Sequence, residues 1–391
     1  MKLVFICAAL EPGRDGVGDY TRRLAGECTA RGHGCTIIAL HDPHVTRVSE
    51  ATAHDVRLIR LPAAAPWPDR LTCAADHLRR LAPDWVSWQL VAYGFHPRGF
   101  LPAALLQRAA DLAGPRCQVM LHELWLGLEA GASWRARATG WLQRRGVLCL
   151  LAQLDPECVQ TSNAAYQEVL RRAGLDARVL GLFGNVPIAA GDPAETRPLA
   201  RWWPAANTPR GDRPLVALTF GTLHPQWRPD ATITWLLATA RRLGRPPALI
   251  AAGRLGPSAA AILAAFRRRG IPVVTTGELD ETTLSHLLRA ADFGIAPHPW
   301  ALIGKSGTAA AMLEHGLPVL VPRNDWRLRG ASTLPFVAPN HLLVRLEGLT
   351  ADDTDRWLAA RRAPESTLPQ IAGAWLENLE TTAAPPAPIH S

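Results

Sequence analysis

Lysine is almost absent from this chain: only Lys2 and Lys305 occur among its 391 residues. The formal charge of +8 at pH 7 therefore comes from arginine. An excess of arginine over lysine is typical of a GC-rich bacterial genome, so the charge alone does not indicate nucleic-acid binding. The arginines are dispersed and no recognition module accompanies them, so we expect no specific nucleic-acid partner. A basic protein does suit an anionic substrate or an anionic membrane surface.

Paired cysteines and long apolar runs are missing as well. The seven cysteines are scattered without a CxxC pair, which argues against a disulfide framework or a zinc site and predicts reduced, buried thiols. The motif at 41–44, His-Asp-Pro-His, has donor atoms but no supporting cluster, so we predict no metal site and no resident cofactor. No apolar run approaches the ~20 residues that span a bilayer, and the apolar start at 1–10 is too short for a signal peptide. We expect a cytoplasmic protein, either soluble or peripheral on the inner face of the membrane.

Short apolar runs alternate with helical stretches along the whole chain. Hydrophobic residues make up 48% of it and charged residues 19%, so sizeable cores can be buried. The alternation predicts doubly wound α/β domains, and the length predicts two of them. The predicted strands are 3–10, 35–40, 85–90, 118–122, 147–151, 158–162, 215–220, 248–252, 273–276, 293–296 and 319–321. The predicted helices are 19–31, 163–173, 231–243, 259–269, 282–290, 308–315, 352–362 and 368–380.

The composition changes near 197–213, where proline and arginine gather, and we interpret this stretch as a linker. It separates a first domain at 1–196 from a second at 214–350. C-terminal helices follow at 351–380, for which a return to the first domain is one option, and then a mobile tail at 381–391.

The segment Gly304-Lys305-Ser306-Gly307-Thr308 runs directly into a short alanine-rich helix. Backbone N–H groups, two hydroxyls and a lysine at a helix N-terminus favour an anion, because the helix dipole is positive there. We predict that Lys305, Ser306, Gly307 and Thr308 bind a diphosphate; the alternative is an ordinary N-cap beside an exposed lysine. The segment also resembles the end of a P-loop, but Pro299 replaces the leading glycine, which excludes an NTPase site.

A second glycine loop, residues 13–19, follows the first predicted strand. Gly16 and Gly18 allow close approach to a ligand, or simply make a tight turn. Asp15 and Asp19 flank them, and one of the two would act as general base on an acceptor hydroxyl if the reaction inverts. Ligands of open α/β sheets bind outside the carboxyl ends of the strands, so two such domains facing one another would bring both glycine loops to one cleft.

The chain resembles glycosyltransferases of the GT-B fold, and among them the large family 4 that uses nucleotide-sugar donors. The N-terminal likeness lies in the glycine loop and in Arg31-Gly32-His33 behind it. The C-terminal likeness is longer and comprises Phe220-Gly221-Thr222-Leu223, Ala251-Ala252-Gly253, Thr276-Gly277-Glu278-Leu279, Ala296-Pro297-His298-Pro299 and Gly316-Leu317-Pro318-Val319. The resemblance implies two Rossmann-like domains across a cleft, with the acceptor in the first and a UDP- or GDP-sugar in the second.

The chain also departs from the family pattern. The paired glutamates of family 4 would fall at Ile303 and Ala311, and neither residue is acidic. Thr222 stands where an arginine is expected, and Arg228 lies near the position of a missing lysine, where it would stabilise the leaving diphosphate. Glu314, one helical turn further on, either serves the ribose or faces solvent. The retaining mechanism of the family is therefore not carried over.

Other site residues follow partly from position and partly from the resemblance. His122 follows a strand where family members often carry a histidine that meets the donor sugar. The predicted catalytic residues are His122, Asp19 and Glu123. The predicted diphosphate site adds Gly16, Gly18 and Arg228 to the 305–308 segment. The nucleotide or sugar pocket is assigned Gly221, Thr222, His224, Gly253, Gly277, His298 and Glu314, and the acceptor is assigned Asp15, Tyr93 and His96.

Trp134 and Trp141 lie seven residues apart among four arginines, so on a helix both rings share one face. We expect core tryptophans beneath a solvated arginine face; the alternative is a face for anionic lipid or an anionic acceptor.

The sequence thus predicts a glycosyltransferase, of hexosyltransferase type, that moves a sugar from a nucleotide-diphosphate sugar to an unidentified acceptor. The alternatives are another GT-B reaction, such as sugar-nucleotide epimerisation or phosphorolysis, and a scaffold that binds sugar nucleotides without catalysis.

Overall fold

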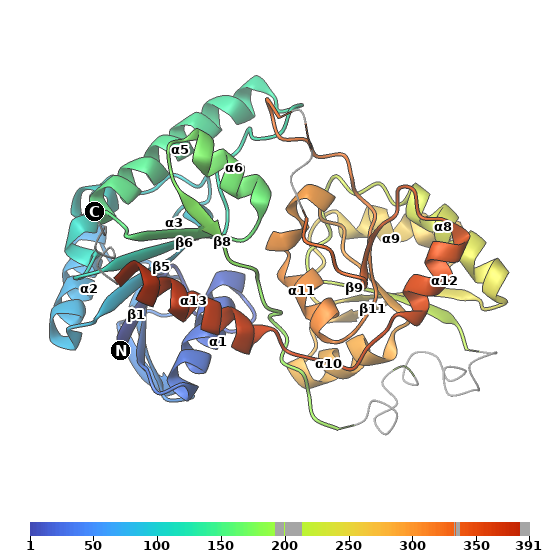
Figure 1. Cartoon of the computed structure of the whole chain (residues 1–391), viewed down its shortest axis with the longest axis horizontal. Helices are drawn as coiled ribbons and strands as arrows, with labels where there is room; N and C mark the ends of the chain where they lie inside the picture. Colours follow the sequence, from blue (N-terminus) through green and yellow to red (C-terminus); the bar gives the residue numbers. More distant parts are fainter. Residues whose placement is uncertain (192–198, 200–212, 332, 334–336, 384–391) are drawn as a thin grey trace, which may run out of the picture. The chain divides into compact units, whose positions relative to one another are not determined.

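The computed structural model describes residues 1–191, 199, 213–331, 333 and 337–383. The chain divides into two compact α/β units (Figure 1): the first comprises Met1–Gly181, Arg327–Pro335 and Leu368–Ser391, and the second Leu182–Trp326 and Phe336–Thr367. The division between Gly181 and Leu182 precedes the boundary expected at 196, and that boundary, like most of the linker expected at 197–213, lies outside the described residues. The tail expected at 381–391 is described only to 383.

The first unit is built on an eight-stranded sheet with the order β3-β4-β2-β1-β5-β6-β7-β8. All neighbouring strands are parallel except β3, which pairs antiparallel with β4. The strands are β1 (Lys2–Cys7), β2 (Gly34–Asp42), β3 (Ser49–Ala53), β4 (Val56–Pro62), β5 (Trp85–Leu90), β6 (Cys117–Leu121), β7 (Cys158–Thr161) and β8 (Ala177–Val179).

Helices pack on this sheet, and one of them returns from the far end of the chain. Helix α13 lies beside α1 and β1 (Figure 1), where the Trp375 ring stacks on Phe5 with 5.3 Å between ring centroids. The other helices of the unit are α1 (Gly16–Ala30), α2 (Trp67–Leu81), α3 (Ala92–Phe95), α4 (Ala103–Arg108), η1 (Ala109–Leu112), α5 (Trp134–Leu154) and α6 (Ala164–Arg172), and α13 spans Leu368–Ala383.

Two expectations about α5 are wrong. Residues 147–151, predicted as a strand, belong to this helix, because Val147, Leu150, Leu151 and Leu154 repeat at helical spacing and all four are buried on one face. The tryptophans expected in the core are exposed: Trp134 is 72% and Trp141 53% accessible.

The second unit has a six-stranded, wholly parallel sheet with the order β11-β10-β9-β12-β13-β14. Its predicted strands and helices are confirmed to within three residues at each end; among the described elements, β14 and the short helix η3 were not predicted. The strands are β9 (Leu215–Phe220), β10 (Pro247–Ala252), β11 (Val273–Gly277), β12 (Phe293–Ile295), β13 (Val319–Val321) and β14 (Leu343–Arg345). The helices are α8 (Asp230–Leu243), α9 (Ala259–Arg268), α10 (Glu281–Ala290), η3 (Trp300–Lys305), α11 (Gly307–Glu314) and α12 (Ala351–Ala359).

Strand β9 shows why its sequence is continuously apolar. Val216, Leu218 and Phe220 pack into the core on one face of the sheet, while Leu215 and Ala217 pack into the core on the other. A parallel strand covered by helices on both faces needs apolar side chains at every position.

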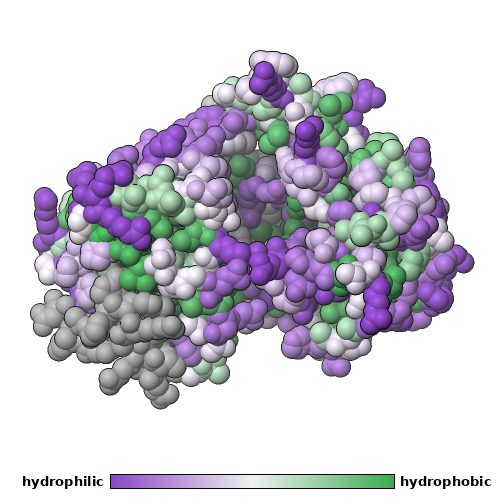
Figure 2. All heavy atoms as spheres, turned by 180° about the vertical axis from the view of Figure 1, so that it is seen from behind, coloured by the Kyte–Doolittle hydropathy of each residue, from purple (hydrophilic) through white to green (hydrophobic). Residues whose placement is uncertain are grey.

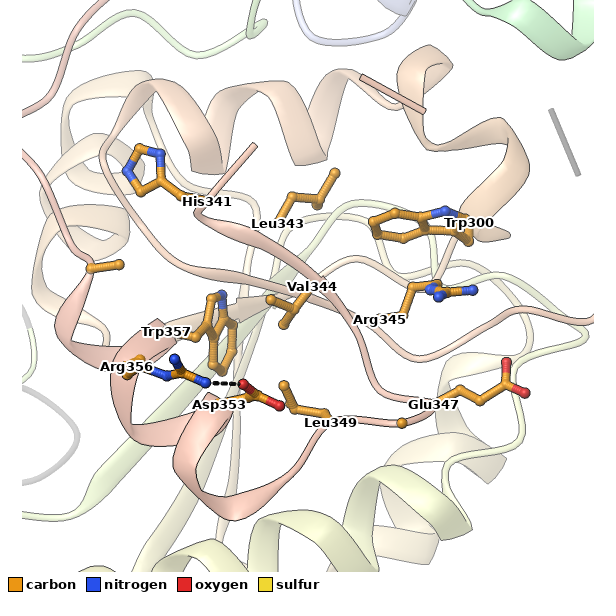
Figure 3. Close-up of a pocket in the computed structure, with 12 residues that line it drawn as sticks. Trp300, His341, Leu343, Val344, Arg345, Glu347, Leu349, Asp353, Arg356 and Trp357 are labelled. Carbon is orange, nitrogen blue, oxygen red and sulfur yellow. Dashed lines mark hydrogen bonds and ion pairs between the residues drawn. The ribbon is translucent and has the colours of Figure 1, made fainter. Parts of the chain in front are cut away.

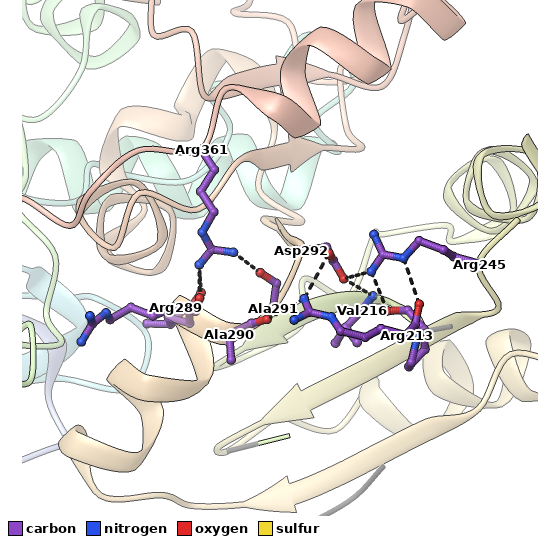
Figure 4. A network of polar contacts seen from close by, with 10 residues as sticks. Arg213, Val216, Arg245, Arg289, Ala290, Ala291, Asp292 and Arg361 are labelled. Atoms are coloured by element: carbon purple, nitrogen blue, oxygen red, sulfur yellow. Dashed lines mark hydrogen bonds and ion pairs between the residues drawn. The ribbon is translucent and has the colours of Figure 1, made fainter. Parts of the chain in front are cut away.

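Asp292, just before β12, anchors the beginning of this sheet (Figure 4). Its carboxylate accepts hydrogen bonds from the Val216 backbone at 2.8 Å and from the guanidinium groups of Arg245 at 2.8 Å and Arg213 at 3.2 Å. Hydrogen bonds to a partly buried charge each contribute about 1.5–3 kcal/mol, so this network holds β9 beside β12.

The strand orders place a topological switch point in each unit. In the first unit, successive strands run outward from β1 in one direction and from β5 in the other; in the second unit the same reversal occurs between β9 and β12. Ligands of doubly wound sheets bind at such points, beyond the carboxyl ends of the strands. The loops after β1, β5, β9 and β12 are therefore where a site is expected.

All seven cysteines are free thiols, and five of them are buried. Among the described residues, no helix is both long and apolar enough to cross a bilayer. The face seen in Figure 2 is largely hydrophilic, with hydrophobic residues between the polar ones.

Candidate functional site

Three predicted glycines stand side by side at the strand ends of the second unit. Gly221, Gly253 and Gly277 all have positive φ, at 73°, 80° and 70°. The Gly221 N–H donates to the carbonyl of Ala252 at 3.0 Å, and the Gly253 N–H donates to the carbonyl of Gly277 at 2.7 Å. Only glycine adopts this conformation without strain, so the three strands turn sharply here and leave their ends open.

The N-terminus of α11 meets this glycine edge. The Ser306 hydroxyl caps α11 by accepting from the Ala309 N–H at 3.2 Å, and it lies 3.0 Å from the Thr308 hydroxyl. The same hydroxyl is 3.2 Å from His298 Nδ1, beyond β12. A Cβ atom on Gly221 would lie 3.2 Å from the Thr308 methyl group. The structure therefore brings the predicted residues Gly221, His298, Ser306 and Thr308 together at the switch point.

Cationic side chains border two neutral histidines in this cluster. Burial, together with the charges of Arg323 and Lys305, lowers the pKa of His224 to about 4. Burial lowers the pKa of His298 to about 4 as well, and Lys305 contributes in the same direction. Both imidazoles are neutral near pH 7, whereas lysine and arginine are cationic. The electrostatic field at this helix N-terminus therefore favours an anion.

Arg323 is a member of the cluster that the sequence analysis missed. It is 5% exposed and donates to His224 Nδ1 at 2.6 Å, to the Gln226 side chain at 2.9 Å and to Asp325 at 2.9 Å. Arg228, predicted near the position of the missing lysine, is exposed, and its role toward the diphosphate stays a prediction. The sequence did contain one indication that Arg323 belongs to the site: it lies just beyond the apolar strand β13, at the same edge of the sheet as His298.

The positions of the missing glutamates are buried in the apolar core. Ile303 is 4% and Ala311 0% exposed, and a Cβ atom on Gly184 would lie 2.5 Å from the Ala311 Cα. The backbone at Gly184 therefore covers residue 311, and a glutamate side chain at this position would have no room.

Glu314 does not face solvent, as one of its two interpretations had it. It is 1% exposed, and its Oε1 accepts from the backbone N–H of Thr367 at 2.8 Å and from the Thr367 hydroxyl at 2.6 Å. The carboxylate thus fastens the segment before α13 to α11. Its Oε2 is also buried and has no hydrogen-bond partner within the described part of the chain, so the predicted place in a nucleotide pocket stays a prediction.

Asn185 was also missed and lies beside the loop predicted to bind a diphosphate. Its Oδ1 would be 3.9 Å from a Cβ atom on Gly307, and this buried oxygen has no hydrogen-bond partner within the described part of the chain. A buried acceptor in a native fold normally receives a hydrogen bond, so Oδ1 is available to a ligand hydroxyl or a water molecule.

In the first unit, both aspartates of the glycine loop hold the loop itself. Asp15 caps α1 by accepting from the N–H groups of Val17 at 2.9 Å and Gly18 at 2.8 Å. Both carboxylate oxygens of Asp19 lie 3.1 Å from the Gly13 nitrogen and accept from it. Burial raises the pKa of Asp15, and the two backbone bonds counteract that rise. The loop is therefore fixed by the residues proposed as acceptor and catalytic groups.

The two glycines of this loop differ in what surrounds them. A Cβ atom on Gly18 would lie 2.4 Å from the carbonyl oxygen of Ala9, whereas a Cβ atom on Gly16 would meet nothing within 4 Å. Gly18 is thus required for α1 to pack against the end of β1.

We expect Gly18→Ala to lower the free energy of unfolding by about 1–3 kcal/mol, because the backbone must shift to admit the methyl group. Gly16→Ala is the matched control and should keep or slightly raise stability, since it only restricts the unfolded chain. Urea titrations of the two variants measure the difference; equal stability would contradict the packing role of Gly18.

His122 ends a chain of buried polar side chains that crosses the sheet. Its Nε2 lies 2.9 Å from Gln89 Oε1, and the Gln89 amide NH₂ donates to Ser87 Oγ at 2.8 Å. The chain continues from Ser87 to Gln118 at 2.6 Å and from Gln118 to Gln160 at 3.0 Å. With this orientation of the amides, His122 Nε2 carries the proton and Nδ1 is the unprotonated nitrogen.

Burial lowers the pKa of His122 to about 3. The ring is 7% exposed and packs edge-on against Tyr20, with 4.8 Å between centroids. So weak a base is poorly matched to proton transfer near pH 7, and the geometry favours hydrogen bonding by a neutral imidazole.

Three further predicted residues lie near the same sheet edge. Tyr93, beyond β5, accepts through its hydroxyl from the Gln143 amide at 3.0 Å, and His96 Nδ1 accepts from the Arg98 N–H at 3.1 Å. Glu123 follows His122 and is half-buried. Tyr93 and His96 thus take part in local packing, which was the alternative to a role in the acceptor site.

A shallow groove of about 500 Å³ lies along β14 in the second unit (Figure 3). Trp300, Arg345 and Trp357 line it, and the pair Asp353–Arg356 closes one side. It contains none of the predicted site residues, so it is distinct from the cluster around Ser306.

In the described ranges, no group of three or more histidine, cysteine, aspartate or glutamate side chains is placed to hold a metal ion.

Comparison with known proteins supports the fold. No protein-family model and no characterised protein sequence matches the chain. Sucrose-phosphate synthase from Thermosynechococcus elongatus aligns over 98% of this chain and 100% of its own, with a TM-score of 0.59 and 16% identity. HepE from Anabaena, in complex with UDP and glucose, aligns over 97% and 100% with a TM-score of 0.58 and 15% identity. WaaG, a glycosyltransferase involved in lipopolysaccharide biosynthesis, aligns over 97% and 95% with a TM-score of 0.53 and 15% identity.

The alignments extend over nearly the whole of both chains, so both units and their order are shared. At these identities the likeness concerns the fold. The chain therefore has the two-unit, Rossmann-like GT-B fold of glycosyltransferases, as the sequence resemblance predicted.

Proposed function

We propose that the protein transfers a sugar, a hexose, from a nucleotide-diphosphate sugar to an acceptor nucleophile, with the donor diphosphate bound in the second unit. The observation that carries this proposal is the cluster at the switch point of that unit. There the capped N-terminus of α11, with its two hydroxyls, lies beside Gly221 at the glycine edge, and the charges of Lys305 and Arg323 act on the neighbouring His224. The fold is one that binds UDP and glucose in Anabaena HepE.

The chemistry of such a transfer concentrates negative charge on the leaving diphosphate. Fixed cations and backbone N–H groups aimed at that charge lower the barrier most when they are in place beforehand. Lys305 and the N-terminal N–H groups of α11 would meet the diphosphate directly. Arg323 is held by Asp325. Its positive charge would act on the diphosphate site indirectly, through the neighbouring His224. These groups supply the counter-charge from the protein itself, and we propose that no resident cofactor takes part.

In the first unit, we propose His122 as a hydrogen-bonding group for the donor sugar and the glycine loop at 13–19 as part of the acceptor side. A neutral imidazole with a low pKa orients a sugar hydroxyl without taking its proton. Asp19 remains a candidate base only if its bonds to Gly13 open when the acceptor binds. We place the protein in the cytoplasm, where nucleotide sugars are made.

The test is binding followed by turnover. UDP-, GDP- and ADP-sugars are added at millimolar concentrations, and the melting temperature is followed; a donor that binds the folded state raises it by mass action. The stabilising donor is then incubated with the protein and a panel of hydroxyl acceptors, and nucleoside diphosphate and glycosylated product are measured by mass spectrometry. No stabilisation by any of the three donors would contradict the donor site.

Incubation with donor alone separates the alternatives. A new epimer of the sugar nucleotide, or a sugar phosphate formed with inorganic phosphate, would assign an epimerase or a phosphorylase. Stabilisation by donor without consumption under all conditions would identify a binding scaffold.

A further inference from the structure

Helix α5 presents an aromatic stripe to solvent. Trp134 is 72%, Trp141 53% and Leu142 51% exposed, and Leu126, in the loop that precedes the helix, is 46% exposed. These are four of the six large hydrophobic side chains that are exposed among the described residues. Single exposed hydrophobic side chains are normal on a protein surface, but several on one helix and its preceding loop point to an interaction surface.

The spacing of residues along the helix places the two tryptophans on one face. Trp134 and Trp141 are seven residues apart and therefore lie one above the other on the same face. The opposite face is fixed to the first unit. A Cβ atom on Gly140 would lie 1.8 Å from the Leu126 carbonyl oxygen, and the buried Gln143 donates to Tyr93 at 3.0 Å and to the Arg98 carbonyl at 2.7 Å. The tryptophans cannot turn inward without unpacking the helix.

Arginines flank the stripe, and acidic residues are missing from it. Arg137 and Arg144 each follow a tryptophan by three positions and border one side, and Arg135 borders the other. The 21-residue helix carries four arginines and no aspartate or glutamate. Arg135 lies 5.4 Å from the Trp134 ring and Arg145 lies 5.0 Å from the Trp141 ring, so charge and aromatic surface are interleaved.

We propose that this face of α5 binds the surface of an anionic lipid bilayer. Tryptophan rings prefer the boundary between headgroups and acyl chains, and arginines beside them meet lipid phosphates. Charge complementarity favours a lipid surface over a second copy of the chain. Because α5 carries no acidic residue, two copies of this helix would bring four arginines against four, and like charges repel. The inference stands on α5 alone and does not depend on the proposed reaction.

The experiment uses the whole protein and vesicles of defined composition. At about 0.1 M salt we expect co-sedimentation with phosphatidylcholine vesicles that contain 30–50% phosphatidylglycerol. Binding to pure phosphatidylcholine should be about a hundredfold weaker or more, since each of the four arginines near an anionic surface contributes about fivefold. Tryptophan fluorescence should shift to the blue only with the anionic vesicles. Raising the salt to about 0.5 M should release the protein.

Two variants test the two parts of the surface. Trp134→Ala with Trp141→Ala, and Arg135→Gln with Arg145→Gln, should each weaken binding about tenfold or more while leaving the melting temperature unchanged, because these side chains are exposed. The matched control is Arg79→Gln with Arg356→Gln, which removes the same charge from exposed side chains elsewhere.

Three results would overturn the proposal. They are equal binding to anionic and neutral vesicles, no binding to either, and retained binding by both α5 variants. A dimer in analytical ultracentrifugation that the tryptophan variant dissociates, without vesicle binding, would assign the face to self-association instead.

Discussion

Lys305→Ala is expected to reduce kcat/KM for the nucleotide-sugar donor about 10²–10³-fold, because it removes a fixed cation from the place where the leaving diphosphate gains charge. Lys305 ends η3 immediately before the α11 cap, and its charge is felt by both His224 and His298. The loss should fall mainly on kcat, since the charge on the diphosphate grows in the transition state. Steady-state kinetics with the donor identified by thermal shift measures it.

Because lysine is so rare in this chain, the second lysine can serve as the control for Lys305→Ala. Lys2, the second lysine of the chain, lies at the start of β1 and is exposed, so Lys2→Ala should leave both constants unchanged. Reductive methylation followed by mass spectrometry gives a second readout that needs no acceptor. Bound nucleoside diphosphate should slow modification of Lys305 and leave modification of Lys2 unaffected.

Arg323→Lys separates a direct role from an indirect one. Arg323 is tied to Asp325, Gln226 and His224, and lysine cannot reproduce its fork of hydrogen bonds. If Arg323 acts through His224, the variant should raise KM with a smaller effect on kcat.

Normal kinetics of Lys305→Ala, with equal labelling of Lys305 in the presence and absence of nucleotide, would contradict the diphosphate site.

The parts of the fold that sequence predicts best are the central parallel strands. Strands β5, β9 and β13 have the predicted bounds because a strand buried on both faces is apolar throughout and ends where the apolar run ends. The same rule fails at 147–151, where an apolar run belongs to the buried face of α5. Run length alone does not separate a buried strand from one side of a long helix. Strands β3, β4, β8 and β14 were not predicted. β3 and β8 are largely exposed, and arginines interrupt or end the apolar runs of β4 and β14.

The site shows a similar limit. Gly221, His298, Ser306 and Thr308 could be placed from sequence because each stands directly at a strand end or a helix start. Arg323 and Asn185 could not, since their place depends on how β13 and the segment after β8 fold back on α11. The exposure of Trp134 was missed for the same reason: helical spacing shows which residues share a face, but not which face the sheet will cover.

His122 is expected to remain neutral far below its ordinary titration range and to make the first unit sensitive to acid. Its pKa is about 3 in the folded protein and 6.5 without the fold's influence. A depressed pKa means that folding favours the neutral ring. The stabilisation is fully present above pH 6.5 and is lost as pH falls from 6.5 toward about 3. In that window the unfolded chain binds one more proton than the folded chain, which costs about 1.4 kcal/mol per pH unit.

Between pH 6.5 and 4.5 this single ring should therefore remove about 2–3 kcal/mol of stability. His122→Gln should lower the slope of unfolding free energy against pH by about one proton between pH 4 and 6. His54→Asn is the matched control: His54 is exposed, and asparagine accepts its positive φ of 50°. That variant should keep the slope of the parent protein.

Nitrogen-15 NMR of histidine-labelled protein tests the same point at the level of the ring. His122 should show a protonated Nε2 and an unprotonated Nδ1 at pH 7, the tautomer set by Gln89, and should not titrate above pH 5. Gln89→Leu removes the acceptor and should release that tautomer preference. A midpoint near 6.5 would mean that the ring is solvated and able to exchange protons near neutral pH. His122 would then return as a candidate base, and the hydrogen-bonding role proposed for it toward the sugar would have to be abandoned.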